Sequence, residues 1–202
     1  MKRRPGLSRA VILLVIAFLL VPAGGWFGTP SGPRAQAPKE ELAPFVPTPQ
    51  GVVDAMLRMA EVKKGDVLYD LGSGDGRIVI TAAKRYGVRA VGFELDEGLI
   101  AESRQKARQE GVAHLVQFRK QDVMTVDLSP ATVVTLYLLP EANLALRPRI
   151  LSQLRPGARV VSHDYHMGDW PTVRVEEVRE QDRLHEVHTI YLWRIGATRP
   201  PQ

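Results

Sequence analysis

The stretch VLYDLGSGDGRIVI, residues 67–80, is the sequence feature that most constrains the fold. It begins with a continuous apolar run at residues 67–71, which is typical of a parallel strand that is buried on both faces. The run leads into Gly72, Gly74 and Gly76, and a helix-like pattern follows. Glycines at this spacing indicate a tight turn that something approaches closely. A parallel strand that leads into a helix favours an α/β fold.

The rest of the chain alternates helix and strand patterns in the same way. Helices are expected at residues 49–60, 76–86, 97–110 and 140–154, and strands at 67–71, 89–95, 114–122, 131–139 and 158–165. Two further β-like runs between residues 172 and 195 have little room between them, so we expect them to pair antiparallel. This order predicts a doubly wound α/β fold, with a mostly parallel seven-stranded sheet, helices on both faces and an antiparallel C-terminal strand pair.

Residues 1–37 have the composition of an export signal. Basic residues precede twelve apolar residues at 10–21, a run within the ~7–15 of a signal peptide and shorter than the ~20 of a membrane-spanning helix. Cleavage after Ala37, cleavage after Ala23 and an uncleaved anchor remain open. We therefore predict a signal peptide or anchor at 1–37, a linker and lid at 38–47, and one domain at 48–196. The domain is expected on the non-cytoplasmic side, or in the cytoplasm if the leader is not functional.

The basic character of the chain belongs to this leader. The formal net charge is +5, and residues 1–37 contain five basic and no acidic residues, which leaves 22 basic and 22 acidic residues in the remainder. A neutral domain lacks the positive surface that phosphate backbones attract, so no nucleic-acid partner is expected. Membrane contact is expected through the N-terminal segment only. The absence of cysteine excludes disulfides and thiolate metal sites.

The spacing of the turn separates two kinds of nucleotide ligand. Dinucleotide-binding turns read G-x-G-x-x-G, whereas residues 70–76 read D-x-G-x-G-x-G. Asp75 at the start of a helix disfavours a pyrophosphate there and suits a ligand with a cationic end. S-adenosylmethionine (SAM) is such a ligand, because it carries an ammonium and a sulfonium and no phosphate.

Acidic residues also close the next two predicted strands. Glu94 ends the second strand and is placed to accept hydrogen bonds from ribose hydroxyls. Asp122 ends the third strand, where it either accepts a bond from an adenine amino group or caps a turn. Together these features predict a SAM site with the residues Asp70, Gly72, Ser73, Gly74, Gly76, Glu94 and Asp122.

At this point the sequence resembles a known family. DLGSGDGRI and GFELD resemble the SAM-binding motifs of class I (seven-strand) methyltransferases. FVPTPQGVVDAML, ATVVTLYLLPEAN and RVVSHDYHMGDW resemble, more narrowly, the small broad-specificity protein-lysine methyltransferases of archaea. They also resemble the mitochondrial enzymes that methylate lysines of ATP synthase and of the adenine nucleotide translocase. The resemblance covers residues 45–195 and implies SAM as cofactor and a protein partner that presents a lysine. The leader, residues 1–37, lies outside this resemblance and departs from the pattern of the family.

The end of the fourth predicted strand should line the path of the methyl acceptor. It reads Tyr137-Leu138-Leu139-Pro140, not the Asn/Asp-Pro-Pro-aromatic sequence that grips a planar amino group, so DNA adenine methylation is disfavoured. Tyr137 either orients an incoming amine or is an ordinary strand aromatic. Phe45 and Thr48 are candidates for a lid over the cofactor, and the alternative for Phe45 is a hydrophobic staple onto the first helix.

The histidines near the C-terminal end give weaker signals. His163 is a candidate proton acceptor near the methyl site. His163 and His166 lie three residues apart in a strand-end loop and lack a third ligand at a recognisable spacing, so no metal site is predicted. His185 and His188 are expected in an exposed strand.

The domain carries no insertion large enough to enclose an elaborate small molecule, which favours an exposed side chain of another protein as acceptor. We therefore predict a SAM-dependent methyltransferase, expected to be a monomer, that acts on protein lysines. A small-molecule or nucleic-acid methyltransferase on the same fold, and a non-enzymatic SAM-fold binding protein, remain the alternatives.

Overall fold

The computed structural model describes residues 45–179 and 186–196. Its strands are β1 (Val67–Leu71), β2 (Arg89–Glu94), β3 (Val116–Lys120), β4 (Val133–Leu136), β5 (Arg159–His163), β6 (Arg174–Arg179) and β7 (Val187–Arg194). Its helices are α1 (Gln50–Met59), α2 (Arg77–Tyr86), α3 (Glu97–Gln109) and α4 (Pro140–Gln153), with a short 3-10 helix, η1 (Val123–Thr125).

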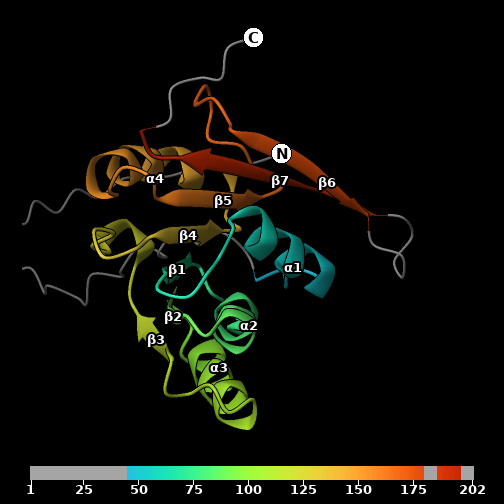
Figure 1. Ribbon diagram of the computed structural model, residues 1–202. Helices are drawn as coiled ribbons and strands as arrows, with labels where there is room; N and C mark the ends of the chain where they lie inside the picture. Colours follow the sequence, from blue (N-terminus) through green and yellow to red (C-terminus); the bar gives the residue numbers. More distant parts are fainter. Residues whose placement is uncertain (1–44, 180–185, 197–202) are drawn as a thin grey trace, which may run out of the picture. The chain divides into compact units, whose positions relative to one another are not determined.

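The seven strands form one sheet in the order β3-β2-β1-β4-β5-β7-β6 (Figure 1). The first five strands pair in parallel. β7 runs antiparallel to both of its neighbours, β5 and β6. The predicted doubly wound sheet, with its antiparallel C-terminal pair, is therefore confirmed.

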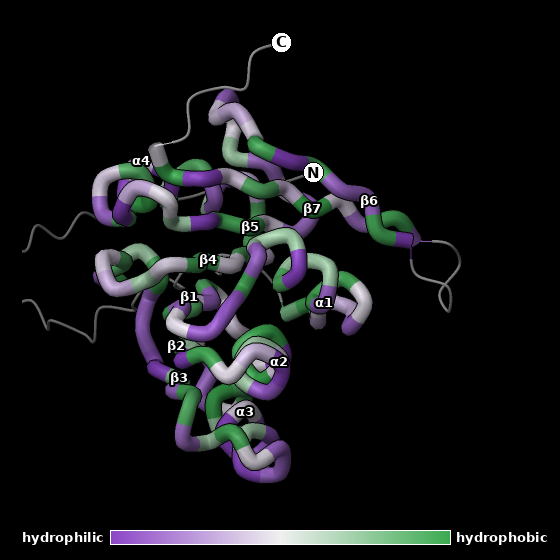
Figure 2. The backbone as a smooth tube through the Cα atoms, in the orientation of Figure 1, coloured by the Kyte–Doolittle hydropathy of each residue, from purple (hydrophilic) through white to green (hydrophobic). Residues whose placement is uncertain are grey.

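Two hydrophobic cores cover the two faces of the sheet. On one face, α1, α2 and α3 pack their apolar side chains against the strands. On the other face, α4 and the segment that contains η1 form a second core, in which Trp193 of β7 is fully buried. Figure 2 shows hydrophobic residues recurring along β4 and β5, while the outer end of α3 is largely hydrophilic. Helices on both faces are thus confirmed.

Several helix boundaries lie at the glycine, proline and capping residues that the sequence suggested. Gly87 ends α2 with a left-handed φ of 65°. Asp96 caps α3 by accepting a hydrogen bond from the Leu99 amide, and Pro140 occupies the first turn of α4. Four predicted strands, 89–95, 114–122, 131–139 and 158–165, were longer than the observed β2, β3, β4 and β5. The difference is largest for β4, which ends at Leu136. The partner of Leu136 in β1 is Leu71, the last residue of that strand, so β1 offers Tyr137 no pairing partner.

The topology fixes where a ligand can bind. The chain order reverses between β1 and β4, which lie side by side at the centre of the sheet (Figure 1). In open α/β sheets, ligands bind beyond the carboxyl ends of the strands at such a switch point. The glycine turn, residues 72–76, follows β1 at this edge.

No helix within residues 45–179 and 186–196 is long and apolar enough to cross a membrane. The predicted signal peptide or anchor at 1–37 lies outside the described residues, as does His185.

Candidate active site

The glycine turn is shaped by close contacts with protein side chains. Gly72, Gly74 and Gly76 all have left-handed φ angles, of 81°, 51° and 78°. A Cβ on Gly74 would lie 2.5 Å from the ring of Phe45, and one on Gly76 would lie 2.7 Å from the ring of Phe118. Protein side chains therefore approach all three glycines closely: Leu138 at Gly72, and aromatic rings at Gly74 and Gly76.

The backbone amides of the turn are already used. The N–H groups of Gly72 and Ser73 both donate to the Phe93 carbonyl oxygen, each at 2.9 Å. The N–H of Gly74 donates to Oε2 of Glu94, also at 2.9 Å. A phosphate-binding turn instead points such amides at its ligand. This turn is consequently built for a ligand without phosphate, as its spacing predicted.

Asp75 has a different role from the one expected. Its carboxylate lies 2.7 Å from Nη2 of Arg77 and 2.8 Å from Nζ of Lys106. Burial raises its pKa, but the hydrogen bonds from these two cations outweigh burial and lower the pKa to about 2. The expectation that Asp75 faces a cationic ligand is therefore wrong, because its positive partners belong to the protein.

Asp70 is the buried acid of the site. It lies at the end of β1 with 2% exposure, and it accepts a hydrogen bond of 2.7 Å from Oγ1 of Thr135. Burial raises its pKa to about 7, and the nearby charges of Glu94 and Asp75 act in the same direction. A cation brought to this edge would favour the ionised carboxylate. Asp70 thus suits the ammonium end of SAM.

Glu94 and Asp122, two residues of the predicted ligand site, both accept hydrogen bonds from backbone amides. Oε1 of Glu94 accepts from the Leu95 amide at 2.7 Å, so this carboxylate organises the end of β2 in addition to the turn. Oδ1 of Asp122 accepts from the Met124 amide at 2.9 Å and caps η1. The capping role considered for Asp122 is therefore confirmed. The ribose and adenine contacts stay predictions.

The entry segment, residues 45–49, lies against this turn. Phe45 is 48% exposed and its ring covers Gly74. Thr48 is buried, its carbonyl oxygen accepts a hydrogen bond of 2.8 Å from Nη1 of Arg77, and its hydroxyl lies 3.3 Å from Nδ1 of His163. The segment therefore joins the glycine turn to the end of β5, which is where a lid would sit. A cofactor contact from Phe45 or Thr48 stays a prediction.

Tyr137 and His163 come together beside the end of β4, where the methyl acceptor was predicted to enter. Their ring centroids are 3.9 Å apart. Burial raises the pKa of the half-buried Tyr137, and the charge of Asp164 adds to this effect. His163 is fully buried, and burial lowers its pKa to about 4, so its ring is neutral at pH 7. A neutral imidazole can accept a proton, although this ring faces protein atoms.

His188 of β7 contacts His163, a contact that sequence reasoning missed. Nδ1 of His188 lies 2.9 Å from Nε2 of His163, and its side chain is only 12% exposed. The expectation of an exposed position is therefore wrong. The register between β7 and β5 explains the contact. His163 pairs with Ile190, and every second side chain of a strand lies on the same face of the sheet, so His188 lies on the face that carries His163.

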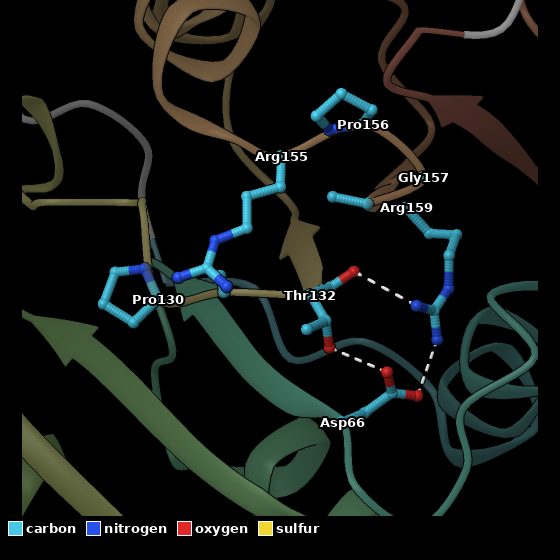
Figure 3. Close-up of a pocket in the computed structure, with 9 residues that line it drawn as sticks. Asp66, Pro130, Thr132, Arg155, Pro156, Gly157 and Arg159 are labelled. Atoms are coloured by element: carbon cyan, nitrogen blue, oxygen red, sulfur yellow. Dashed lines mark hydrogen bonds and ion pairs between the residues drawn. The ribbon is translucent and has the colours of Figure 1, made fainter.

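A cavity of about 250 Å³ lies at the opposite edge of the sheet, next to the starts of β1, β4 and β5 (Figure 3). Three of its polar residues, Asp66, Thr132 and Arg159, hydrogen-bond to one another. Asp66 accepts hydrogen bonds from Nη2 of Arg159 at 2.6 Å and from Oγ1 of Thr132 at 2.7 Å. The amino ends of parallel strands are not where such sheets bind ligands. We therefore locate the active site at the glycine turn.

The match to known proteins agrees with this location. Residues 70–174 match the model of the family described as ANTKMT methyltransferase domain. A protein-lysine N-methyltransferase of Saccharolobus islandicus (strain REY15A) is 43% identical over 154 residues, which are 76% of this chain and 94% of that protein. This chain belongs to the ANTKMT methyltransferase domain family.

Further relatives extend the comparison. An adenine nucleotide translocase lysine N-methyltransferase of Mus musculus is 32% identical over 155 residues, covering 76% of this chain and 67% of the relative. A crystal structure described as an RNA methyltransferase from Salinibacter ruber, in complex with S-adenosyl-L-homocysteine, has a TM-score of 0.69 and 51% identity. It covers 78% of this chain and 98% of that one.

This member of the ANTKMT methyltransferase domain family is a SAM-dependent methyltransferase, as the sequence predicted. Three features of its site fit SAM. The amides of residues 72–74 are not free for phosphate, and the two cations next to Asp75 are already paired with acidic side chains of the protein. The acids Asp70, Glu94 and Asp122 lie at the carboxyl ends of three neighbouring strands. SAM would be held by these acids and by the glycine turn.

Proposed function

We propose that this methyltransferase transfers methyl groups to lysine side chains of other proteins. The observation that carries the proposal is the 43% identity to a protein-lysine N-methyltransferase over 94% of that relative's length. The 32% identical mouse relative, an adenine nucleotide translocase lysine N-methyltransferase, supports it. The small size of the domain supports it as well, because a bare sheet edge can receive an exposed side chain from a partner.

The proposed path for the lysine runs past the end of β4. Leu138 is buried and lies close to Gly72, while Tyr137 is half-buried beside His163. A lysine ammonium has a pKa near 10.4 and must lose a proton before its nitrogen can accept a methyl group. An apolar surface disfavours the charged amine and so lowers that pKa. We assign this desolvation to the leucines after β4, and the orientation of the amine to the Tyr137 hydroxyl.

SAM, when bound, supplies the methyl group on a sulfonium that needs no further activation by the protein. The residues of this chain then have three tasks. Asp70 and Glu94 hold the cofactor, the segment that contains Phe45 and Thr48 shields it from water, and Tyr137 orients the amine in line for transfer. The proton of the lysine leaves to solvent, because both ring nitrogens of the buried His163 face protein atoms.

The related Salinibacter structure favours a second candidate, because its description names an RNA methyltransferase. The charge of this chain counts against that acceptor. Outside residues 1–37 the basic and acidic residues balance at 22 each. Proteins gain much of their affinity for RNA when basic side chains neutralise phosphates and release the counterions bound there. A domain without an excess of basic residues lacks this contribution.

A direct competition of acceptors tests the proposal. The chain is incubated with labelled SAM and a mixture of equal masses of a lysine-rich protein extract and total RNA. The protein and RNA fractions are then separated and analysed by mass spectrometry. We expect methylated lysine in the protein fraction and no label above background in RNA. Label in RNA alone would contradict the lysine assignment and leave the methyltransferase assignment intact.

We also propose that the domain acts as a monomer.

We propose further that the leader, residues 1–37, exports or anchors the domain. This proposal is supported by the twelve-residue apolar run behind basic residues. Fractionation of cells that express the full chain, compared with a chain that lacks residues 1–37, checks it. We expect only the full chain outside the cytoplasm or in the membrane fraction, with equal methyl transfer by both proteins in vitro. Equal distribution of the two would contradict the proposal.

A further inference from the structure

We infer that His163, Asp164 and His188 form a binding site for one divalent transition-metal ion, and that Zn²⁺ is the ion their donor atoms suit best. The three residues lie at the end of β5 and on β7, next to the acceptor side of the active site. The inference rests on this geometry and not on the identity of the methyl acceptor, so either can fail without the other.

The three donor atoms form a nearly regular triangle. Nε2 of His163 lies 2.9 Å from Nδ1 of His188 and 3.2 Å from Oδ2 of Asp164. The remaining side, from Nδ1 of His188 to Oδ2 of Asp164, measures 3.3 Å. Tetrahedral zinc with bonds of about 2.0–2.1 Å separates its ligands by about 3.3–3.4 Å. One ion can therefore reach all three atoms at ordinary bond lengths with shifts of a few tenths of an ångström.

When the proton of His163 is on Nδ1, the triangle holds too few protons to pair all three donor atoms. Neutral His163 can place its one proton on Nδ1, toward the hydroxyl of Thr48 at 3.3 Å. Its Nε2 and the Asp164 carboxylate are then both acceptors, and Nδ1 of His188 offers at most one proton to the two of them. A cation at the centre would satisfy all three lone pairs together.

The surrounding contacts hold two of the three donors, those of His163 and Asp164, as metal ligands are usually held. Metal-binding histidines commonly engage their second ring nitrogen, and ligating carboxylates their second oxygen, with other protein groups. Here Nδ1 of His163 faces Thr48, and Oδ1 of Asp164 accepts from the Thr189 amide at 2.8 Å. Asp164 also adopts a left-handed φ of 59°, which is uncommon for a non-glycine residue.

The donor set narrows the choice of ion. Two imidazole nitrogens and one carboxylate oxygen suit zinc and its neighbours, whereas Mg²⁺ and Ca²⁺ prefer oxygen ligands throughout. Three protein ligands leave a fourth position for water. The ion would tie β5 to β7 and, through His163, to Thr48 of the entry segment. We therefore assign it a role in fixing the acceptor side of the site.

The test uses the full chain, purified without a histidine tag, treated with EDTA and dialysed. Zn²⁺ is added, and bound metal is measured by elemental analysis after gel filtration. We expect close to one Zn²⁺ per chain, a rise in Tm of roughly 5 °C or more at saturating ion, and visible absorption typical of four-coordinate Co²⁺ when cobalt replaces zinc. No stoichiometric ion and no cobalt spectrum would overturn the inference and leave a hydrogen-bonded cluster.

Two variants and one control locate the ion. His188→Gln and Asp164→Asn should each lose at least tenfold in zinc affinity, because a metal site with two ligands is weak. His114→Gln, at an exposed histidine in the turn before β3, should bind zinc as the unmodified chain does. Calorimetry with SAM checks that each variant is folded. If a variant fails that check, the cobalt spectrum of the unmodified chain decides. Equal zinc binding by all the proteins would overturn the inference.

Discussion

The two ends of the active-site edge are assembled in different ways. The turn half consists of the glycine turn with Asp70, Glu94 and Asp122, and the histidine half consists of Thr48, Tyr137, His163, Asp164 and His188. In the turn half, the Gly74–Glu94 hydrogen bond joins two consecutive strand ends that are 20 residues apart. In the histidine half, Thr48 reaches His163 across 115 residues. The first half is therefore built mainly from residues that are near in the sequence, and the second from segments that are far apart in it.

We propose that this difference separates cofactor binding from methyl transfer. The turn half contains the acids that fit SAM, and its backbone amides are committed to holding its shape. The histidine half contains the aromatic and imidazole groups beside the proposed lysine path. Changes in the turn half should therefore affect folding and cofactor affinity, whereas changes in the histidine half should affect transfer.

The largest effect is expected from a methyl group added inside the turn. In Gly76→Ala, the new Cβ would lie 2.7 Å from the Phe118 ring, at a left-handed φ of 78°. The backbone conformation costs about 1–2 kcal/mol and overpacking about 1–3 kcal/mol, so the free energy of unfolding should fall by roughly 2–5 kcal/mol. Urea denaturation measures this change.

Gly87→Ala is the matched control for that substitution. Gly87 has a similar left-handed φ of 65°, but a Cβ there would meet nothing within 4 Å. Only the backbone cost of about 1–2 kcal/mol should remain. Equal losses in the two variants would show that packing around Gly76 does not hold the turn.

The next effect concerns the dependence of stability on pH. Burial raises the pKa of Asp70 from 3.8 to about 7, so the folded protein holds a proton there that the unfolded chain releases between these values. Stability should be greatest near pH 4 and fall as pH rises toward 7, by at most about 4 kcal/mol at about 1.4 kcal/mol per pKa unit. Below pH 4 the opposite holds for Asp75, whose lowered pKa of about 2 makes protonation destabilising.

Urea denaturation at pH values from 4 to 7.5, on the unmodified chain and on Asp70→Asn, measures this dependence. The variant cannot titrate at this position, so its stability should vary less with pH. Identical profiles for the two proteins would show that Asp70 is ionised in the folded state throughout this range.

A smaller effect is expected at Glu94. Its carboxylate accepts hydrogen bonds from the amides of Gly74 and Leu95, and it is the predicted partner of the ribose. Glu94→Gln removes the charge, and the affinity for SAM should fall by roughly tenfold to a hundredfold, for a loss of about 1.5–3 kcal/mol. Calorimetry measures the dissociation constant. The control is Asp96→Asn, which keeps the cap of α3 next door. An unchanged SAM affinity in Glu94→Gln would rule out the ribose contact.

The outcome of sequence-based prediction depended on whether a feature is local, and each half of the site contains one residue that was misread. The order of strands, the turn and the acids at the strand ends were predictable, because periodicity and glycine spacing are local signals. Asp75 was misread because its partner Lys106 lies on the next helix, and sequence alone does not show which cation reaches a buried carboxylate. His188 was misread because its burial depends on the register between β7 and β5. Long-range packing decided both.

The most direct test of the division between the two halves is a comparison of Tyr137→Phe with the unmodified chain. The variant keeps the ring beside His163 and loses only the hydroxyl. If Tyr137 orients the acceptor, the rate of lysine methylation should fall about tenfold, and the dissociation constant of SAM should stay unchanged. An unchanged rate, or a SAM affinity that falls together with the rate, would contradict the assignment of the acceptor to this half.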